Sequence, residues 1–332
     1  MPPQGPAAGK GKLIAAAGLG CVALLVVAII AIGMLFGGKS SSAAADHLPE
    51  GCDLVARIDF HGLLDVPAVE KHVVPALEED AKKSEDAVTF AKVLLTAKLN
   101  PKKDIADIAV CVSGLDRATS GGEPDFVGVM GGKFDPKALI DAMAEHGKAD
   151  KLSAPTERDG LRVIESKDSH PKLFFAQASD GAFLVATTFE LLKKAAAADS
   201  SGYKLPSDHL AIVVPAEATK RLAKLAPSKQ GFDFGSAGRA ELTANFAPGK
   251  VAARADLGSA ATATSTAAQL NAMVPMLKLG GQVPSEAKAT VDGLKIEAKG
   301  NELIIEAPIA AETIEKVAKE MADGIKQADK EL

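Results

Sequence analysis

Residues 33–40 spell the pattern in this chain that is closest to a chemical motif. Gly33, Gly38, Lys39 and Ser40 fit the phosphate-loop spacing G-x-x-x-x-G-K-S. In a working phosphate loop a short buried strand precedes the turn and a helix follows it, so that backbone N–H groups converge on the phosphates. Here a long apolar run precedes the pattern and a small-residue stretch follows it. The sequence therefore predicts no nucleotide site and no cofactor.

The histidines and serines also lack the spacing that metal binding or nucleophilic catalysis requires. No two histidines lie four residues apart, and no H-E-x-x-H frame is present. Ser236 lies in Gly-Ser-Ala-Gly, but Phe234 stands where a nucleophile elbow needs glycine. The sequence predicts a non-catalytic protein without a metal site. A hydrolase with a spatially assembled site ranks third, after the two binding functions given at the end of this section. The six histidines are His47, His61, His72, His146, His170 and His209.

Two of the three cysteines form a candidate disulfide. Cys52 and Cys111 lie in the part of the chain that follows the apolar run, and Cys21 lies within the run. In an oxidising compartment a bridge between Cys52 and Cys111 would persist, and closing so long a loop contributes about 4 kcal/mol in the chain-entropy model. Two separate buried thiols are the alternative, because spacing alone does not give the distance between the sulfurs.

A run of 24 uncharged residues from Leu13 to Phe36 predicts a transmembrane helix. At ~1.5 Å per residue this helix is ~36 Å long, enough to cross a ~30 Å hydrocarbon core. Lys10 and Lys12 precede the run and acidic residues follow it, which predicts a cytoplasmic N-terminus. The expected location is the inner membrane of a bacterial envelope, single-pass, with the main domain periplasmic. The lipid bilayer is then a partner through residues 13–36.

Small residues four apart in this run, such as Ala16 and Gly20, favour a weak homodimer through the anchor. Composition excludes another class of partner. The net charge is −5 and aromatic residues make up 4% of the chain, with no Trp. Nucleic-acid binding needs a basic surface and usually aromatic stacking, so no nucleic-acid partner is expected.

The pattern of apolar residues predicts an α+β fold: a transmembrane helix followed by a duplicated module of antiparallel sheet covered by helices. Alternation with period two indicates strands and a period of 3.6 indicates helices. The same order of strands and helices begins after Leu48-Pro49 and again after Leu205-Pro206. The predicted organisation is a cytoplasmic tail (1–12), a transmembrane helix (13–36), a flexible linker (37–47) and two repeat units (48–200 and 205–332).

Two segments are candidate contact surfaces. Phe232 and Phe234 lie in a Gly-rich stretch, where they form either an inward-packed hairpin edge or an exposed contact loop. The helix predicted over Ser259–Leu279 is rich in small residues, which favour close packing on a sheet or leave a groove for an acyl chain. We therefore expect an extracytoplasmic binding or scaffold protein, whose partner is another envelope protein. A carrier or sensor of a lipophilic ligand, held between sheet and helices, is the alternative.

Overall fold

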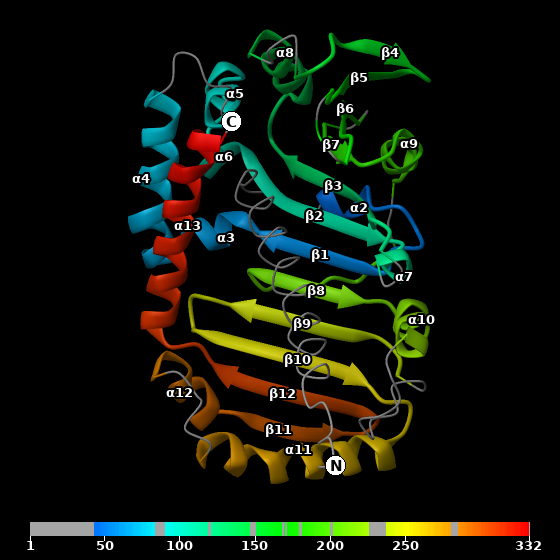
Figure 1. The fold of residues 1–332 in the computed structure, drawn as a ribbon, viewed down its shortest axis with the longest axis vertical. Coiled ribbons are helices and arrows are strands. Elements are labelled where there is room, and N and C mark those ends of the chain that lie inside the picture. The colour runs from blue at the N-terminus through cyan, green and yellow to red at the C-terminus, as the bar shows by residue number, and fades with distance from the viewer. Residues whose placement is uncertain are drawn as a thin grey trace, which may run out of the picture.

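The computed structural model describes residues 43–331, apart from residues 84–89, 119–120, 147–150, 168, 170, 179–180, 200–201, 226–236 and 280–284. Within these residues the chain forms an α+β fold in which helices flank one 12-stranded sheet (Figure 1). All neighbouring strands are antiparallel. The strand order is β11-β12-β10-β9-β8-β1-β2-β3-β7-β6-β5-β4.

The first half of the sheet is apolar on both of its faces. Every residue of β2 from Ile105 to Val112 is buried, as expected for a strand covered on both sides. The elements of this half are α2 (Ala43–Asp46), β1 (Leu54–Asp59), α3 (Phe60–Leu64), α4 (Pro67–Lys83), α5 (Phe90–Thr96), α6 (Pro101–Asp104), β2 (Ile105–Ser113), α7 (Leu115–Ala118), β3 (Asp125–Gly132), α8 (Pro136–His146), β4 (Thr156–Arg158), β5 (Leu161–Glu165), β6 (Phe174–Gln177), β7 (Phe183–Ala186) and α9 (Phe189–Ala197).

The second half is apolar on one face and charged on the other. Residues of β11 alternate between exposed and half-buried, and Lys250 of β10 pairs with Glu306 of β12 at 2.8 Å. Its elements are β8 (Leu210–Val214), α10 (Ala216–Leu225), β9 (Ala240–Asn245), β10 (Lys250–Asp256), α11 (Ala260–Leu279), α12 (Ser285–Asp292), β11 (Lys295–Lys299), β12 (Glu302–Pro308) and α13 (Ala311–Glu331).

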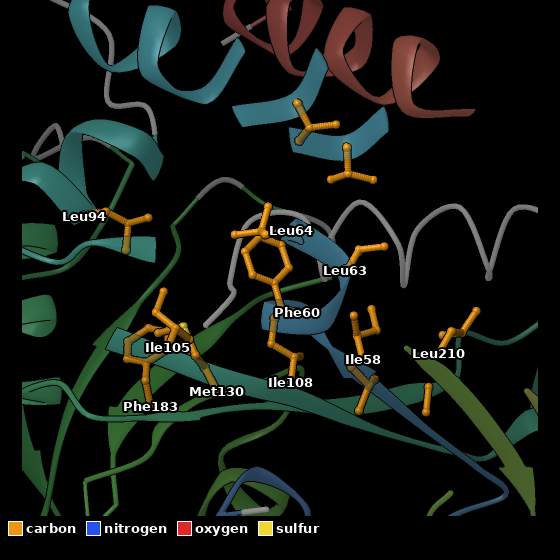
Figure 2. Packing of buried hydrophobic residues seen from close by; sticks show 14 of the residues in the cluster. Ile58, Phe60, Leu63, Leu64, Leu94, Ile105, Ile108, Met130, Phe183 and Leu210 are labelled. Atoms are coloured by element: carbon orange, nitrogen blue, oxygen red, sulfur yellow. The ribbon is translucent and has the colours of Figure 1, made fainter. Parts of the chain in front are cut away.

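The largest core cluster lies between one face of the sheet and helices α3, α4, α5, α8 and α13. Figure 2 shows Phe60, Leu63 and Leu64 of α3 standing above Ile58 and Ile108 of the strands. Phe60 is 2% exposed, and burying such a side chain contributes roughly 1.5–3 kcal/mol. A second cluster covers the opposite face of the first half and contains α2, α9 and Cys52. These two clusters fix α3 and α9 on opposite faces.

The predicted fold class began with a transmembrane helix, and this is corrected. None of the helices within the described ranges is long and apolar enough to cross a membrane. The segment Leu13–Phe36, with the predicted tail and residues 37–42 of the predicted linker, lies outside the described residues. At the end of that linker stands helix α2, whose Ala44 is fully buried against the sheet.

The two stretches that are predicted to repeat form the two halves of a single sheet. Outward from β1 the strands run β2, β3, β7, β6, and outward from β8 they run β9, β10, β12, β11, so the strand order of the halves matches. The helices that follow do not match. Leu192 of α9 packs with the cluster around Cys111, whereas Ala318 of α13 packs on the opposite face, where α13 lies beside α4 (Figure 1). The unit boundaries 48–200 and 205–332 stay a prediction.

Candidate functional site

The structure places the cysteines singled out in the sequence next to each other. Cys111 lies in β2 opposite Val55 of β1, and Cys52 lies just before β1. Their sulfur atoms form a disulfide with a Cα–Cα distance of 5.5 Å, and both residues are buried. Phe232 and Phe234, the predicted contact residues, lie outside the described residues. The bridge therefore stabilises the fold and leaves the binding surface to be sought elsewhere.

Many charged side chains within the described part of the chain form ion pairs. No group of three or more His, Cys, Asp or Glu in that part is placed to hold a metal ion. The buried Asp53 accepts hydrogen bonds from the backbone N–H of Leu115 and from Arg221 of α10, and so joins the two halves. The hydrogen bond to Asp53 also raises the pKa of Arg221.

Two alanines of the small-residue helix α11 pack against the sheet. Ala263 is fully buried and Ala267 is 6% exposed, and both pack in a cluster with Leu303 of β12. Close approach of helix and sheet therefore explains these two alanines, and neither of the two recesses described below is lined by residues of α11.

The first apolar recess lies beneath α13 and is partly open to solvent, since its lining residue Val317 is 39% exposed. We call it the α13 cavity. It measures about 70 Å³, which is small beside the ~300–1,000 Å³ of ligand pockets. Its two polar residues are His209 and Thr313, and His209 Nδ1 accepts the backbone N–H of Phe246 at 3.0 Å. Burial lowers the pKa of His209. The cavity is lined by Ile58, Leu63, Val69, His209, Leu210, Phe246, Ile309, Thr313, Ile314, Val317, Ala318 and Met321.

The second recess opens to solvent between α4 and α5, and we call it the α4–α5 groove. It measures about 590 Å³, within the range of small-molecule sites. Leu64 and Leu94 are buried at its base, whereas Leu95 is 63% exposed at its edge. The groove is lined by Leu64, Val74, Leu77, Glu78, Leu94, Leu95, Lys98, Leu99, Asn100, Pro101 and Lys102.

Local sequence explains how the groove is built. Pro75 lies within α4 and Pro101 begins α6, with Asn100 as its N-cap accepting the backbone N–H of Lys102 at 3.0 Å. A proline at the first turn and an asparagine cap are favourable at a helix start. Leu94 and Leu99 both line the groove, at the end of α5 and after it. The wall opposite α4 is thus a helix end, a short turn and a new helix.

Two of the four polar side chains of the groove are held by neighbours. Asn100 caps α6, and Lys102 Nζ lies 2.7 Å from Glu70 and 3.8 Å from Asp65. The hydrogen bond to Glu70 raises the pKa of Lys102. The side chains of Glu78 and Lys98 form no hydrogen bond or ion pair with other residues in the described ranges. These two charges are the ones available to a ligand.

Lys98 has a backbone conformation that residues other than glycine rarely adopt. Its φ is 55°, in the left-handed region. The N–H of Lys98 bonds the carbonyl of Leu95 at 3.0 Å, and the N–H of Leu99 bonds that of Leu94 at 2.8 Å. This is the Schellman end of a helix, where the left-handed position is usually glycine. The apolar spacing over residues 84–98 predicts a helix that stops at Asn100-Pro101. This local signal does not show that residues at the end of that helix line a groove with α4.

The described residues thus define an α+β protein with one wide antiparallel sheet and an open apolar groove between α4 and α5. No model of a known protein family matches the sequence, and no curated protein matches it.

Solved structures of TP0453 show weak similarity to the chain. Crystal form I of TP0453 is 13% identical, with 86% of this chain and 100% of that chain covered and a TM-score of 0.44. Crystal form III is 15% identical, with 85% and 100% covered and a TM-score of 0.44. Crystal form IV is 14% identical, with 84% and 97% covered and a TM-score of 0.43.

Proposed function

We propose that this chain is a non-catalytic binding protein of the extracytoplasmic side of a bacterial cell envelope, and that it holds a lipophilic ligand in the α4–α5 groove. The observation that carries the proposal is the groove itself, about 590 Å³ in size and lined mainly by aliphatic side chains. An exposed Leu95 beside such a recess is favourable once an apolar ligand covers it. The function therefore depends on binding, without a chemical step.

The compartment is supported by the buried disulfide. Cys52 and Cys111 are joined in the folded protein, and disulfides form and persist chiefly outside the cytoplasm. A reporter enzyme that is active only outside the cytoplasm, fused after Leu332, should be active in cells. A second reporter, which is active only in the cytoplasm, is fused at the same position. Activity of this second reporter, with none from the first, would contradict the location.

The ligand is tested with a neutral apolar dye, N-phenyl-1-naphthylamine, whose fluorescence rises when it leaves water. We expect saturable binding to the full-length protein. Leu95→Asp should weaken binding about tenfold, because the loss of part of a leucine contact costs about 1.4 kcal/mol. Since Leu95 is 63% exposed, this change leaves the core packing intact.

The matched control is Val317→Asp on α13. Val317 is 39% exposed and lines the α13 cavity, so it is an accessible aliphatic residue outside the groove. Its substitution should leave dye binding unchanged. Equal losses in the two variants, or no saturable binding to the wild-type protein, would refute the groove as the site. A surface that recruits another envelope protein would then be the better hypothesis.

A further inference from the structure

We infer that the ligand of the α4–α5 groove is a single unbranched aliphatic chain with an anionic head group, and that Lys98 binds the head group. The inference deepens the proposed function and rests on it. It follows from the lining, from the charge available at the edge and from the backbone of Lys98.

The lining selects an aliphatic chain. Six of the described lining residues are Leu or Val, and none of the described lining residues is aromatic. Rings of sugars and bases are usually bound by stacking on aromatic side chains, which these residues do not offer. Flexible aliphatic walls such as Leu77 and Leu99 favour a chain of methylene groups, each of which gains about 0.8 kcal/mol on burial.

The charged residues that line the groove indicate the charge of the head group. Lys102 is neutralised by Glu70 and Asp65, whereas Lys98 has an unpaired ammonium group within the described structure. The carbon stem of a lysine lies along apolar surface while its charge stays at the rim, and this suits an amphiphile whose head remains near water. Glu78 is the other unpaired charge and belongs to the α4 side of the groove.

The backbone distinguishes Lys98 from Glu78. Lys98 occupies the left-handed position of a Schellman helix end, with φ 55°, where glycine is the least strained residue. Glu78 lies within the regular helix α4. Strained positions are concentrated at binding sites, where contacts with the ligand offset the strain. The geometry therefore points to Lys98 as the residue kept for a ligand contact, and to an anion as the group it contacts.

The experiment compares three probes of equal chain length on the full-length protein: hexadecanoic acid, hexadecanol and hexadecylamine, each displacing N-phenyl-1-naphthylamine. We expect the acid to bind about fivefold more tightly than the alcohol, a difference typical of one solvent-accessible ion pair. The amine should bind no more tightly than the alcohol. Lys98→Met removes the charge and keeps an aliphatic stem, so it should abolish the preference for the acid and leave alcohol binding unchanged.

Lys103→Met is the matched control, because Lys103 is an exposed lysine of α6 that does not line the groove. It should leave the preference for the acid intact. Equal affinity for acid and alcohol in the wild-type protein, or tighter binding of the amine, would overturn the anionic head group while the proposed function stands. Failure of all three probes and of the dye would refute the proposed function itself.

Discussion

Removal of the Cys52–Cys111 disulfide should destabilise the protein strongly, because the bridge closes a long loop. The two residues are separated by 59 positions in the sequence. In the chain-entropy model a loop of this length contributes about 4 kcal/mol at 25 °C. Domains are usually stable by about 5–15 kcal/mol, so the bridge accounts for a large part of the total.

The assay is urea unfolding followed by circular dichroism, with and without a reductant. For a slope of about 2–3 kcal/mol per molar urea, the expected fall in the midpoint is about 1–2 M. The double variant Cys52→Ala/Cys111→Ala is the control, because it should unfold at the lower midpoint whether or not reductant is present. A reductant effect below about 1 kcal/mol on the wild-type protein would refute the reasoning.

Three further changes test the packing and the groove. Asp107 is fully buried and bonded to Arg57 at 2.9 Å, and burial raises the pKa of Asp107, so Asp107→Ala should cost about 3 kcal/mol in urea unfolding and Asp107→Asn less than half of that. The hydrogen bond from Lys71, followed by that from His72, lowers the pKa of Glu315 from 4.5 to about 2. This carboxylate thus adds stability above pH 4.5 that is lost as the pH falls toward 2, and Glu315→Gln should flatten that part of the profile of melting temperature against pH. Lys98→Gly should raise the stability by about 0.5 kcal/mol, since relief of the left-handed strain exceeds the entropy cost of glycine.

Each of these results has an outcome that contradicts it. Equal costs for the alanine and asparagine variants of Asp107 would show that the charge itself stabilises the fold. An unchanged slope between pH 4.5 and 2 in Glu315→Gln would exclude the contact between α13 and α4 as a source of acid sensitivity. A loss of more than about 1 kcal/mol in Lys98→Gly would indicate that Lys98 is structural, against the ordinary preference for glycine at this position.

Local patterns in the sequence were sufficient to predict most strands and helices. The sequence of residues 161–165 predicts a strand, and Asp135-Pro136 predicts the start of a helix; strand β5 (Leu161–Glu165) has these bounds, and helix α8 begins at Pro136. Alternation of apolar residues and a proline in the first turn are local signals, so the elements that they predict are also present in the folded protein. Strand β4 was missed because its three residues are all exposed, although Asp159-Gly160 after it forms a two-residue turn with positive φ at both positions.

Long-range packing could not be predicted in the same way. The helical spacing of Ile314, Val317 and Met321 predicts a helix that packs on a sheet, but nothing local in the sequence places α13 beside α4. The two halves of the sheet were expected to be equivalent. They differ because α13 packs beside α4 on one face of the sheet, whereas α9 packs on the other face. The α4–α5 groove was not predicted either, because it is the space left between helices and depends on where α5 ends.

The most direct test of the central claim is to locate a bound aliphatic chain on the protein. The full-length protein is incubated with hexadecanoic acid that carries a diazirine on its chain, irradiated, digested and mapped by mass spectrometry. We predict that the crosslinks fall on residues 74–78 of α4 and residues 94–99 at the end of α5, and that unlabelled hexadecanoic acid in excess removes them. Crosslinks confined to α11 or to the residues of the α13 cavity, or crosslinks that excess acid does not remove, would contradict the account.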